Sequence, residues 1–188
     1  NSEEVGAFIA DVTGHGTPAA LFASLVRYTF QTYKPYIADP SGLCEGMNRS
    51  IYGRTGTYFL TAGYLFVSTR LRVARYASCG HPPLIYQRYD GTVQPIKGRG
   101  RAMAVVESNR PETIEIKINS GDRLFLYTDG LEEVIEKIKH TSVADWLSRF
   151  RLEPLQAIQD DIRSLIHANR NSKNSIDDDI TWILIEIE

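Results

Sequence analysis

An apolar run that ends in an aspartate limits most strongly how this chain can fold. Residues 5–10 are apolar, Asp11 follows them, and a glycine-rich loop over 13–16 leads into a segment with helical periodicity. Thr17 suits the N-cap of that helix because its hydroxyl can accept an amide proton, and Pro18 suits the first helical turn. The pattern predicts a strand, a tight loop and a helix. Asp11 is then either a solvated turn residue or an acid held beside free backbone amides.

The same arrangement of acid and strand occurs twice more along the chain. Asp129 and Gly130 follow the apolar run 124–127, and the acidic triplet 177–179 leads into the apolar run 182–185. If these strand ends converge, Asp11, Asp129 and Asp178 form an all-oxygen pocket with too much negative charge to stand empty. A hard divalent cation, Mg²⁺ or Mn²⁺, is the ion that such oxygen ligands prefer.

Composition narrows the class of protein. The 188 residues are 43% hydrophobic, which is enough for one globular domain. The formal net charge of −2 gives no basic surface for nucleic acid, and no apolar run approaches the roughly 20 residues that span a bilayer. Cys44 and Cys79 lie far apart and no charged-then-apolar leader follows Asn1, so we expect a reducing, cytoplasmic environment.

Hydrophobic periodicity predicts an α+β fold, with strands first and last and helices in two blocks. The helix over 18–33 carries an apolar stripe that we expect to pack on a sheet, formed by Leu21, Phe22, Leu25, Val26, Thr29 and Phe30. The other predicted helices cover 42–51, 131–139, 142–150 and 154–168, and the predicted strands cover 58–67, 71–77, 84–88, 92–96, 114–118, 123–129 and 180–187. We interpret the strands from 58 to 96 as an antiparallel meander, with Asp90-Gly91 as a hairpin turn.

Four motifs together resemble one family. They are DVTGHG at 11–16, ASCGHPP at 77–83, LYTDGLEE at 126–133 and DDIT at 178–181. In this order and approximate spacing they resemble the bacterial sporulation-stage-II-E (SpoIIE) branch of the metal-dependent protein phosphatases, the phosphatase 2C superfamily. The resemblance runs from Ala7 to Glu188, and four motifs in order are far more specific than any one. It implies a sandwich of two antiparallel sheets flanked by helix pairs, with a regulatory interface on the helices between 18 and 51.

The resemblance also implies a role for each acid. Asp11 matches the aspartate that bridges two metal ions, with the Val12 carbonyl as a backbone ligand. Asp129 and Asp178 match the aspartates that hold the first ion, and Asp179 stays open as the alternative to Asp178. Two bound Mn²⁺ or Mg²⁺ ions would activate a water molecule and clamp the phosphate. The water would then be the nucleophile, and no side chain need form a covalent intermediate. This agrees with the absence of a Cys-x5-Arg loop and of a recognisable Ser-His-Asp set.

Two histidines need separate interpretations. His15 lies four residues after Asp11, whereas eukaryotic relatives place a histidine two residues after the matching aspartate, so that role is not transferred. Loop orientation is favoured for His15, and proton transfer stays open, because a histidine side chain can serve in both roles. His81 is interpreted as a turn-stabilising residue, since two prolines follow it.

One departure from the family pattern concerns the start of the chain. Family members usually begin this domain with a Gly-Gly-Asp strand about 20 residues before the position of Asp11, and its aspartate helps to hold the second metal ion. This chain starts at Asn1, so we expect residues 1–188 to form a single, N-terminally incomplete domain. We therefore expect one formed metal position, a weak or absent second position, and low activity.

The resemblance implies a bacterial serine/threonine phosphatase dependent on Mn²⁺ or Mg²⁺. Its substrate would be a phosphorylated regulator of the anti-anti-sigma type, with an upstream sensor or receiver domain in the full-length protein and a homodimer as one assembly to test. The alternative is a non-catalytic or impaired module that binds a regulatory protein, which the missing strand favours. A magnesium-dependent nuclease is disfavoured because the chain lacks a basic surface.

Overall fold

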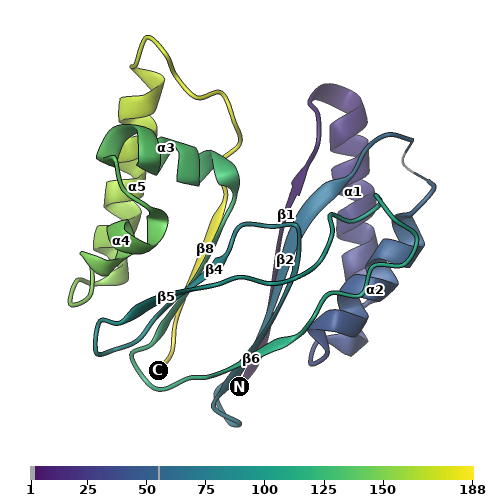
Figure 1. The fold of residues 1–188 in the computed structure, drawn as a ribbon, viewed down its shortest axis with the longest axis horizontal. Helices are drawn as coiled ribbons and strands as arrows, with labels where there is room; N and C mark the ends of the chain where they lie inside the picture. The colour runs from purple at the N-terminus through teal and green to yellow at the C-terminus, as the bar shows by residue number, and fades with distance from the viewer. Residues whose placement is uncertain (1–2, 55) are drawn as a thin grey trace. The chain divides into compact units, whose positions relative to one another are not determined.

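The computed structural model describes residues 3–54 and 56–188, which divide into two compact units. The first unit comprises Asn1–Pro82 and Lys97–Ile118, and the second comprises Pro83–Ile96 and Asn119–Glu188. Each unit has its own four-stranded antiparallel sheet and its own helices (Figure 1). The α+β class with two antiparallel sheets and accompanying helices, predicted from the sequence, is therefore confirmed.

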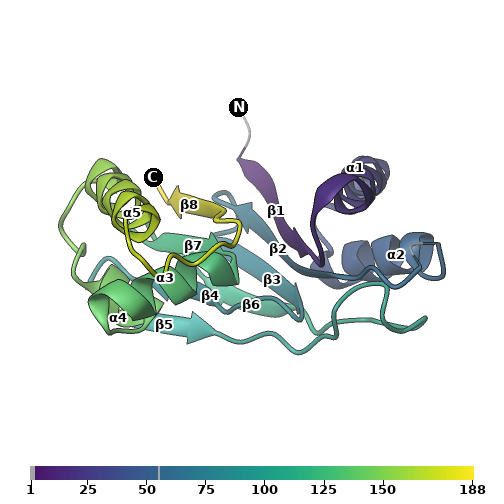
Figure 2. The ribbon, with the colours of Figure 1, turned by 90° about the horizontal axis from the view of Figure 1, so that it is seen from above.

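The first unit contains the sheet β1-β2-β3-β6 and the helices α1 and α2. Its strands are β1 (Glu4–Val12), β2 (Leu60–Ser68), β3 (Val73–Cys79) and β6 (Ile114–Lys117). α1 (Gly16–Thr32), the short 3-10 helix η1 (Lys34–Tyr36) and α2 (Pro40–Ile51) follow β1 in the chain. Figure 2 shows α1 and α2 side by side, and both contribute to one apolar core with β2 and β3.

The start and the buried stripe of α1 both differ from the prediction. His15, not Thr17, is the N-cap, and it makes no side-chain cap hydrogen bond. The helix begins earlier because Gly16 adopts a φ of +78°, which lets the chain turn directly after His15. The apolar stripe is narrower than expected, since Phe22 and Val26 are buried whereas Leu21 is 67% exposed.

Helix α2 begins two residues before its predicted start. The carboxylate of Asp39 accepts a hydrogen bond from the Gly42 amide at 3.1 Å, and Pro40 occupies the first turn, where a missing N–H costs nothing. Along the helix, Leu43, Met47 and Ile51 recur every four residues and are fully buried. This spacing fixes the face of α2 that packs in the core.

The second unit contains the sheet β5-β4-β7-β8, with three helices packed on one of its faces. The strands are β4 (Leu84–Gln87), β5 (Val93–Ile96), β7 (Arg123–Tyr127) and β8 (Trp182–Glu186). The helices are α3 (Asp129–Lys139), α4 (Val143–Ser148) and α5 (Leu155–Arg170). Ile85, Phe125 and Tyr127 point from the sheet into the core that these helices share with it.

The predicted meander over residues 58–96 is wrong. β2 and β3 form one hairpin and β4 and β5 form another, but β3 pairs next with β6 and β4 pairs next with β7. The chain leaves the first sheet after Cys79 because Gly80 turns it with a φ of +72° and Pro82 and Pro83 cannot donate ladder hydrogen bonds. The hairpin turn at Asp90-Gly91 is confirmed: the Thr92 amide donates to Asp90 Oδ1 at 2.8 Å.

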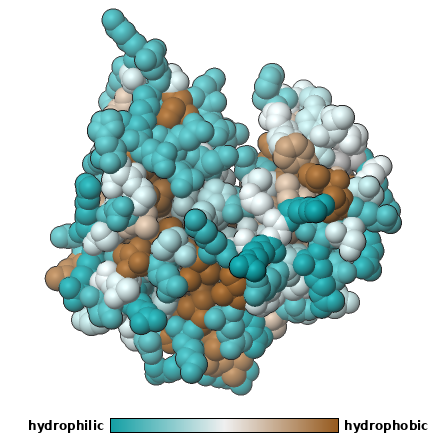
Figure 3. Space-filling view, viewed as in Figure 1, coloured by the Kyte–Doolittle hydropathy of each residue, from teal (hydrophilic) through white to brown (hydrophobic). Residues whose placement is uncertain are grey.

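The face drawn in Figure 3 is largely hydrophilic, with separate hydrophobic areas. Within residues 3–54 and 56–188, none of the helices has the length and apolar character needed to cross a membrane.

Candidate functional site

In the first unit, Asp11 lies near the end of β1. The short loop that follows is hydrogen-bonded to the segment just before β2. Asp11 pairs with Thr61 of β2 and its side chain is half-buried. Two residues later, Thr13 donates from both its amide and its hydroxyl to the Phe59 carbonyl, each at 3.0 Å, and its hydroxyl accepts from the Phe59 amide at 3.1 Å. The backbone after Asp11 is thereby fixed before α1 begins.

His81 stabilises the segment in which the chain leaves the first sheet, as predicted. Its side chain is 8% exposed, and Nδ1 lies 3.0 Å from the hydroxyl of Thr61. The Ser78 hydroxyl accepts from the His81 amide and donates to the His81 carbonyl, both at 3.1 Å. No sequence motif singles out Thr61, which connects His81 to the strand position opposite Asp11. The role of His15, an exposed residue, stays a prediction.

In the second unit, Asp129 begins α3 instead of ending β7 as predicted. β7 stops at Tyr127, and Thr128, which is 2% exposed, is the N-cap of α3. The carboxylate of Asp129 is exposed at the first helical position. An acid in this position interacts favourably with the amide groups of the first turn.

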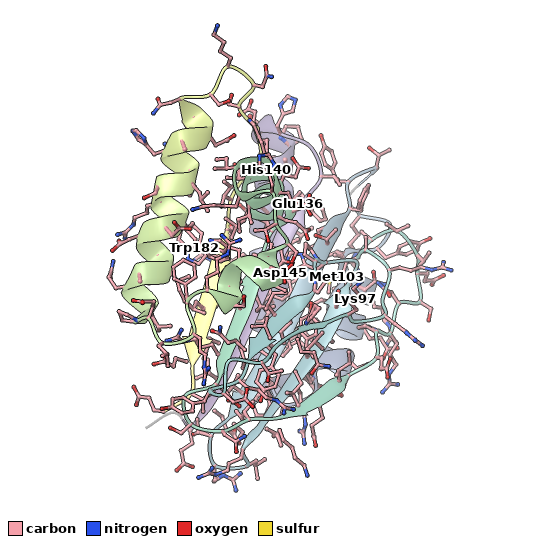
Figure 4. All side chains as sticks on the ribbon, turned by 60° about the vertical axis from the view of Figure 1, so that its left-hand side comes forward. Lys97, Met103, Glu136, His140, Asp145 and Trp182 are labelled. Atoms are coloured by element: carbon pink, nitrogen blue, oxygen red, sulfur yellow. The ribbon has the colours of Figure 1, made fainter. Side chains whose placement is uncertain are left out.

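The loop between α5 and β8 brings Asp178 close to Asp129. A Cβ at Gly130, the residue after Asp129, would lie 3.2 Å from Asp178 Oδ2 and 2.7 Å from the Asp179 carbonyl oxygen. Asp178 Oδ1 accepts a hydrogen bond from the Asp179 amide at 2.9 Å. The acidic triplet lies ahead of β8, which begins at Trp182, labelled in Figure 4. Two of the three predicted acids, Asp129 and Asp178, are far apart in sequence, and the fold places Asp178 against the residue that follows Asp129.

The acidic loop borders a polar hollow of about 410 Å³. It is lined by Ile166, Asn169 and Arg170 of α5 and by residues 175–180. The carboxylates of the triplet 177–179 are exposed, so they can reach a ligand from solvent.

The predicted metal ligands belong to different units, since Asp11 and Val12 lie in the first and Asp129 and Asp178 in the second. Among the residues that the structure describes, no group of three or more His, Cys, Asp or Glu side chains is close enough to hold a metal ion. The donor set itself fits a hard cation, because it consists of carboxylate oxygens and a backbone carbonyl. The convergence of all three acids stays a prediction.

The whole chain, residues 1–188, matches the family model described as Stage II sporulation protein E (SpoIIE). The chain belongs to the SpoIIE family. This confirms the resemblance drawn from the four motifs, and it places the chain in the SpoIIE-type branch of the phosphatase 2C superfamily.

A curated relative of this SpoIIE-family chain is the phosphoserine phosphatase RsbU of Bacillus subtilis, 27% identical over 135 residues. The match covers 71% of this chain and 40% of RsbU. The chain thus corresponds to less than half of the length of that relative.

Solved structures show the same fold. The RsbU and RsbW domains of Rv1364c from Mycobacterium tuberculosis match with a TM-score of 0.79 and 19% identity, covering 98% of this chain and 52% of that one. The phosphatase 2C domain of SpoIIE from Bacillus subtilis, solved with a fragment of the regulatory domain, matches with a TM-score of 0.77 and 19% identity, covering 98% of this chain and 54% of that one. RsbX, solved in complex with magnesium, matches with a TM-score of 0.69 and 18% identity, covering 98% and 81%. The phosphatase 2C-like fold expected from the sequence is confirmed.

Proposed function

We propose that this SpoIIE-family chain is a Mn²⁺- or Mg²⁺-dependent protein phosphatase that hydrolyses phosphoserine or phosphothreonine on a bacterial signalling regulator. The observation that carries the proposal is the position of Asp178 against Gly130, next to Asp129, in a chain that matches the family over its full length. A cation bound between the two acids would offset the repulsion between their negative charges.

Asp11, the Val12 carbonyl, Asp129 and Asp178 are the proposed metal ligands. Asp178 is preferred to Asp179 because its carboxylate lies against Gly130, the residue after Asp129. A divalent cation neutralises charge on the phosphoryl oxygens and makes water a better nucleophile at neutral pH. The chain's own contribution is to hold the acids, with Thr13 fixing the backbone after Asp11 and α3 presenting Asp129.

Relatives support the substrate class and the metal. RsbU is named a phosphoserine phosphatase, and RsbX was solved in complex with magnesium. By analogy, the substrate would be a phosphorylated regulator of the anti-anti-sigma type, and an upstream sensor or receiver domain would control the activity. A cytoplasmic location and a homodimer stay predictions.

Turnover of p-nitrophenyl phosphate and of a phosphoserine peptide with added Mn²⁺ tests the proposal. Asp11→Asn, Asp129→Asn and Asp178→Asn should each lower turnover by about 100-fold or more, because each removes a charged metal ligand. Asp177→Asn is the matched control in the same loop and should retain most of the activity. Loss of activity in Asp179→Asn but not in Asp178→Asn would reassign the ligand.

Calorimetric titration with Mn²⁺ alone counts the bound ions. One tight site is the expectation stated above, and two tight sites would contradict it. Binding of a regulatory protein by a chain that neither binds Mn²⁺ nor turns over either substrate would support the alternative, a non-catalytic binding module.

A further inference from the structure

Thr128 occupies a capping position but uses its hydroxyl elsewhere. An N-cap threonine ordinarily accepts a hydrogen bond from an amide in the first turn of its helix, and Thr128 makes no such bond. Its hydroxyl instead donates to the Asp179 carbonyl and accepts from the Thr181 amide, both at 3.0 Å. Thr128 is 2% exposed, so these bonds are shielded from water. The residue before Asp129 is thus tied to the residue after Asp178.

Asn169 fixes the same loop at a second point. Its side chain is 4% exposed, Oδ1 accepts from the Ile176 amide at 3.0 Å, and Nδ2 donates to the Ile176 carbonyl at 2.9 Å. Lys137 of α3 donates from Nζ to Asn169 Oδ1 at 3.3 Å and also to the Asn174 carbonyl. The loop is therefore fastened to α5 and, through Lys137, to the helix that Asp129 begins.

Only Asp177 and Asp178 lie between these two points of attachment, at Ile176 and at Asp179. Three consecutive carboxylates repel one another, and a loop without attachments would lose conformational entropy when it closed on a cation. A loop already ordered before the ion arrives avoids that cost, which is the general advantage of preorganisation.

We propose that Thr128 and Asn169 are positioning residues for Asp178, holding its carboxylate against Gly130 and beside Asp129 before a cation binds. Neither side chain is a metal ligand in this proposal; each acts through the backbone of the loop. The proposal rests on the proposed function, because the ligand for which the loop is prepared is the divalent cation.

A matched pair of variants tests the role of the hydroxyl. Thr128→Val keeps the shape of the side chain and removes its hydrogen bonds, whereas Thr128→Ser keeps the hydroxyl. In metal-free protein, Thr128→Val should speed hydrogen exchange at the amides of residues 176–181 and weaken Mn²⁺ binding by about 10-fold or more, the usual effect of losing a group that orients a ligand. Turnover at saturating Mn²⁺ should fall much less, and Thr128→Ser should restore the affinity.

A second variant keeps the test sound if Thr128→Val does not fold. Lys137→Met removes the bonds to Asn169 and Asn174 from a half-buried side chain. Lys139→Met, which loses the same charge from the same helix, is its control because Lys139 binds Asp161 at 3.1 Å and not the loop. Faster exchange and weaker Mn²⁺ binding in Lys137→Met alone would support the proposal, and equal effects in both variants would contradict it.

The outcomes separate this proposal from the proposed function. Suppose that the unaltered protein binds Mn²⁺ and hydrolyses phosphate esters. If Thr128→Val then shows the same hydrogen exchange and the same Mn²⁺ affinity as the unaltered protein, only the positioning role is overturned. The same holds if Thr128→Ser is impaired as strongly as Thr128→Val. If the unaltered protein does not bind Mn²⁺, the proposed function and the positioning role fall together.

Discussion

Thr61 and His81 are joined by a hydrogen bond of 3.0 Å between Oγ1 and Nδ1. Thr61 is also the cross-strand partner of Asp11, so the bond connects the segment after β3 to the strand beside the predicted bridging acid. The His81 side chain is almost fully buried, which makes a lost hydrogen bond costly.

Thr61→Val should therefore destabilise the protein. It leaves the His81 Nδ1 without this partner, at a cost of about 1–3 kcal/mol in the free energy of unfolding. Thr61→Ser keeps the hydroxyl and should cost less. Urea unfolding followed by circular dichroism measures both, and equal stability of the two variants would show that the hydrogen bond contributes nothing.

Gly130→Ala sets helix propensity against steric fit. Alanine in a helix is favoured over glycine by about 1 kcal/mol, yet here the added Cβ would lie 2.7 Å from the Asp179 carbonyl oxygen. We expect the collision to displace the acidic loop and to lower Mn²⁺ affinity by about 10-fold or more, as loss of ligand orientation does.

Glu136→Ala is the control for Gly130→Ala. Glu136 is exposed on the same helix and is labelled in Figure 4. Its replacement should leave Mn²⁺ affinity unchanged. A Gly130→Ala variant that binds Mn²⁺ as tightly as the Glu136→Ala variant would contradict the close packing of Asp178 on α3.

Buried tyrosines should make the folded state sensitive to alkaline pH. Burial raises the pKa of Tyr86 to about 12, and the hydrogen bond from its hydroxyl to Asp122 Oδ2 at 2.6 Å acts in the same direction. The unfolded side chain loses its proton near pH 10, so between about pH 10 and 12 the folded state holds the extra proton. Stability should fall as pH rises through this range.

Tyr86→Phe should flatten that alkaline loss, because it removes one of the groups responsible. Burial also raises the pKa of Tyr76 to about 12, so part of the loss should remain. Unfolding free energies measured at several pH values between 8 and 12 check this. An identical slope in Tyr86→Phe and in the unaltered protein would contradict the assignment.

Periodicity and turn chemistry predicted most elements because their signals are local. The four-residue spacing of Leu43, Met47 and Ile51 in α2 and the Asp90-Gly91 turn both hold in the structure. Local signals failed where tertiary pairing decides: Gly80 and the two prolines after His81 indicate a break between β3 and β4, but not that the two strands belong to different sheets. The start of α1 was missed because the positive φ of Gly16 competes with the capping preference of Thr17.

The apolar runs in the sequence indicated the candidate metal-binding acids, but not the residues that hold the acidic loop in place. Asp129 and Asp178 were found because each lies beside an apolar run, and the structure places Asp178 against the residue that follows Asp129. Thr128 and Asn169 carry no comparable signal, since a threonine before a helix is read as a cap and an asparagine near a helix end as a surface residue. Their contacts are with backbone groups distant in sequence, which only the folded chain reveals.

Crystals grown with Mn²⁺ and measured for anomalous scattering test the central claim most directly. The account predicts an anomalous peak with carboxylate oxygens of Asp11, Asp129 and Asp178 within about 2.0–2.3 Å, the range for a hard divalent cation bound by oxygen. A peak bound by other residues, or carboxylates of Asp129 and Asp178 that stay far from Asp11 at saturating Mn²⁺, would contradict it.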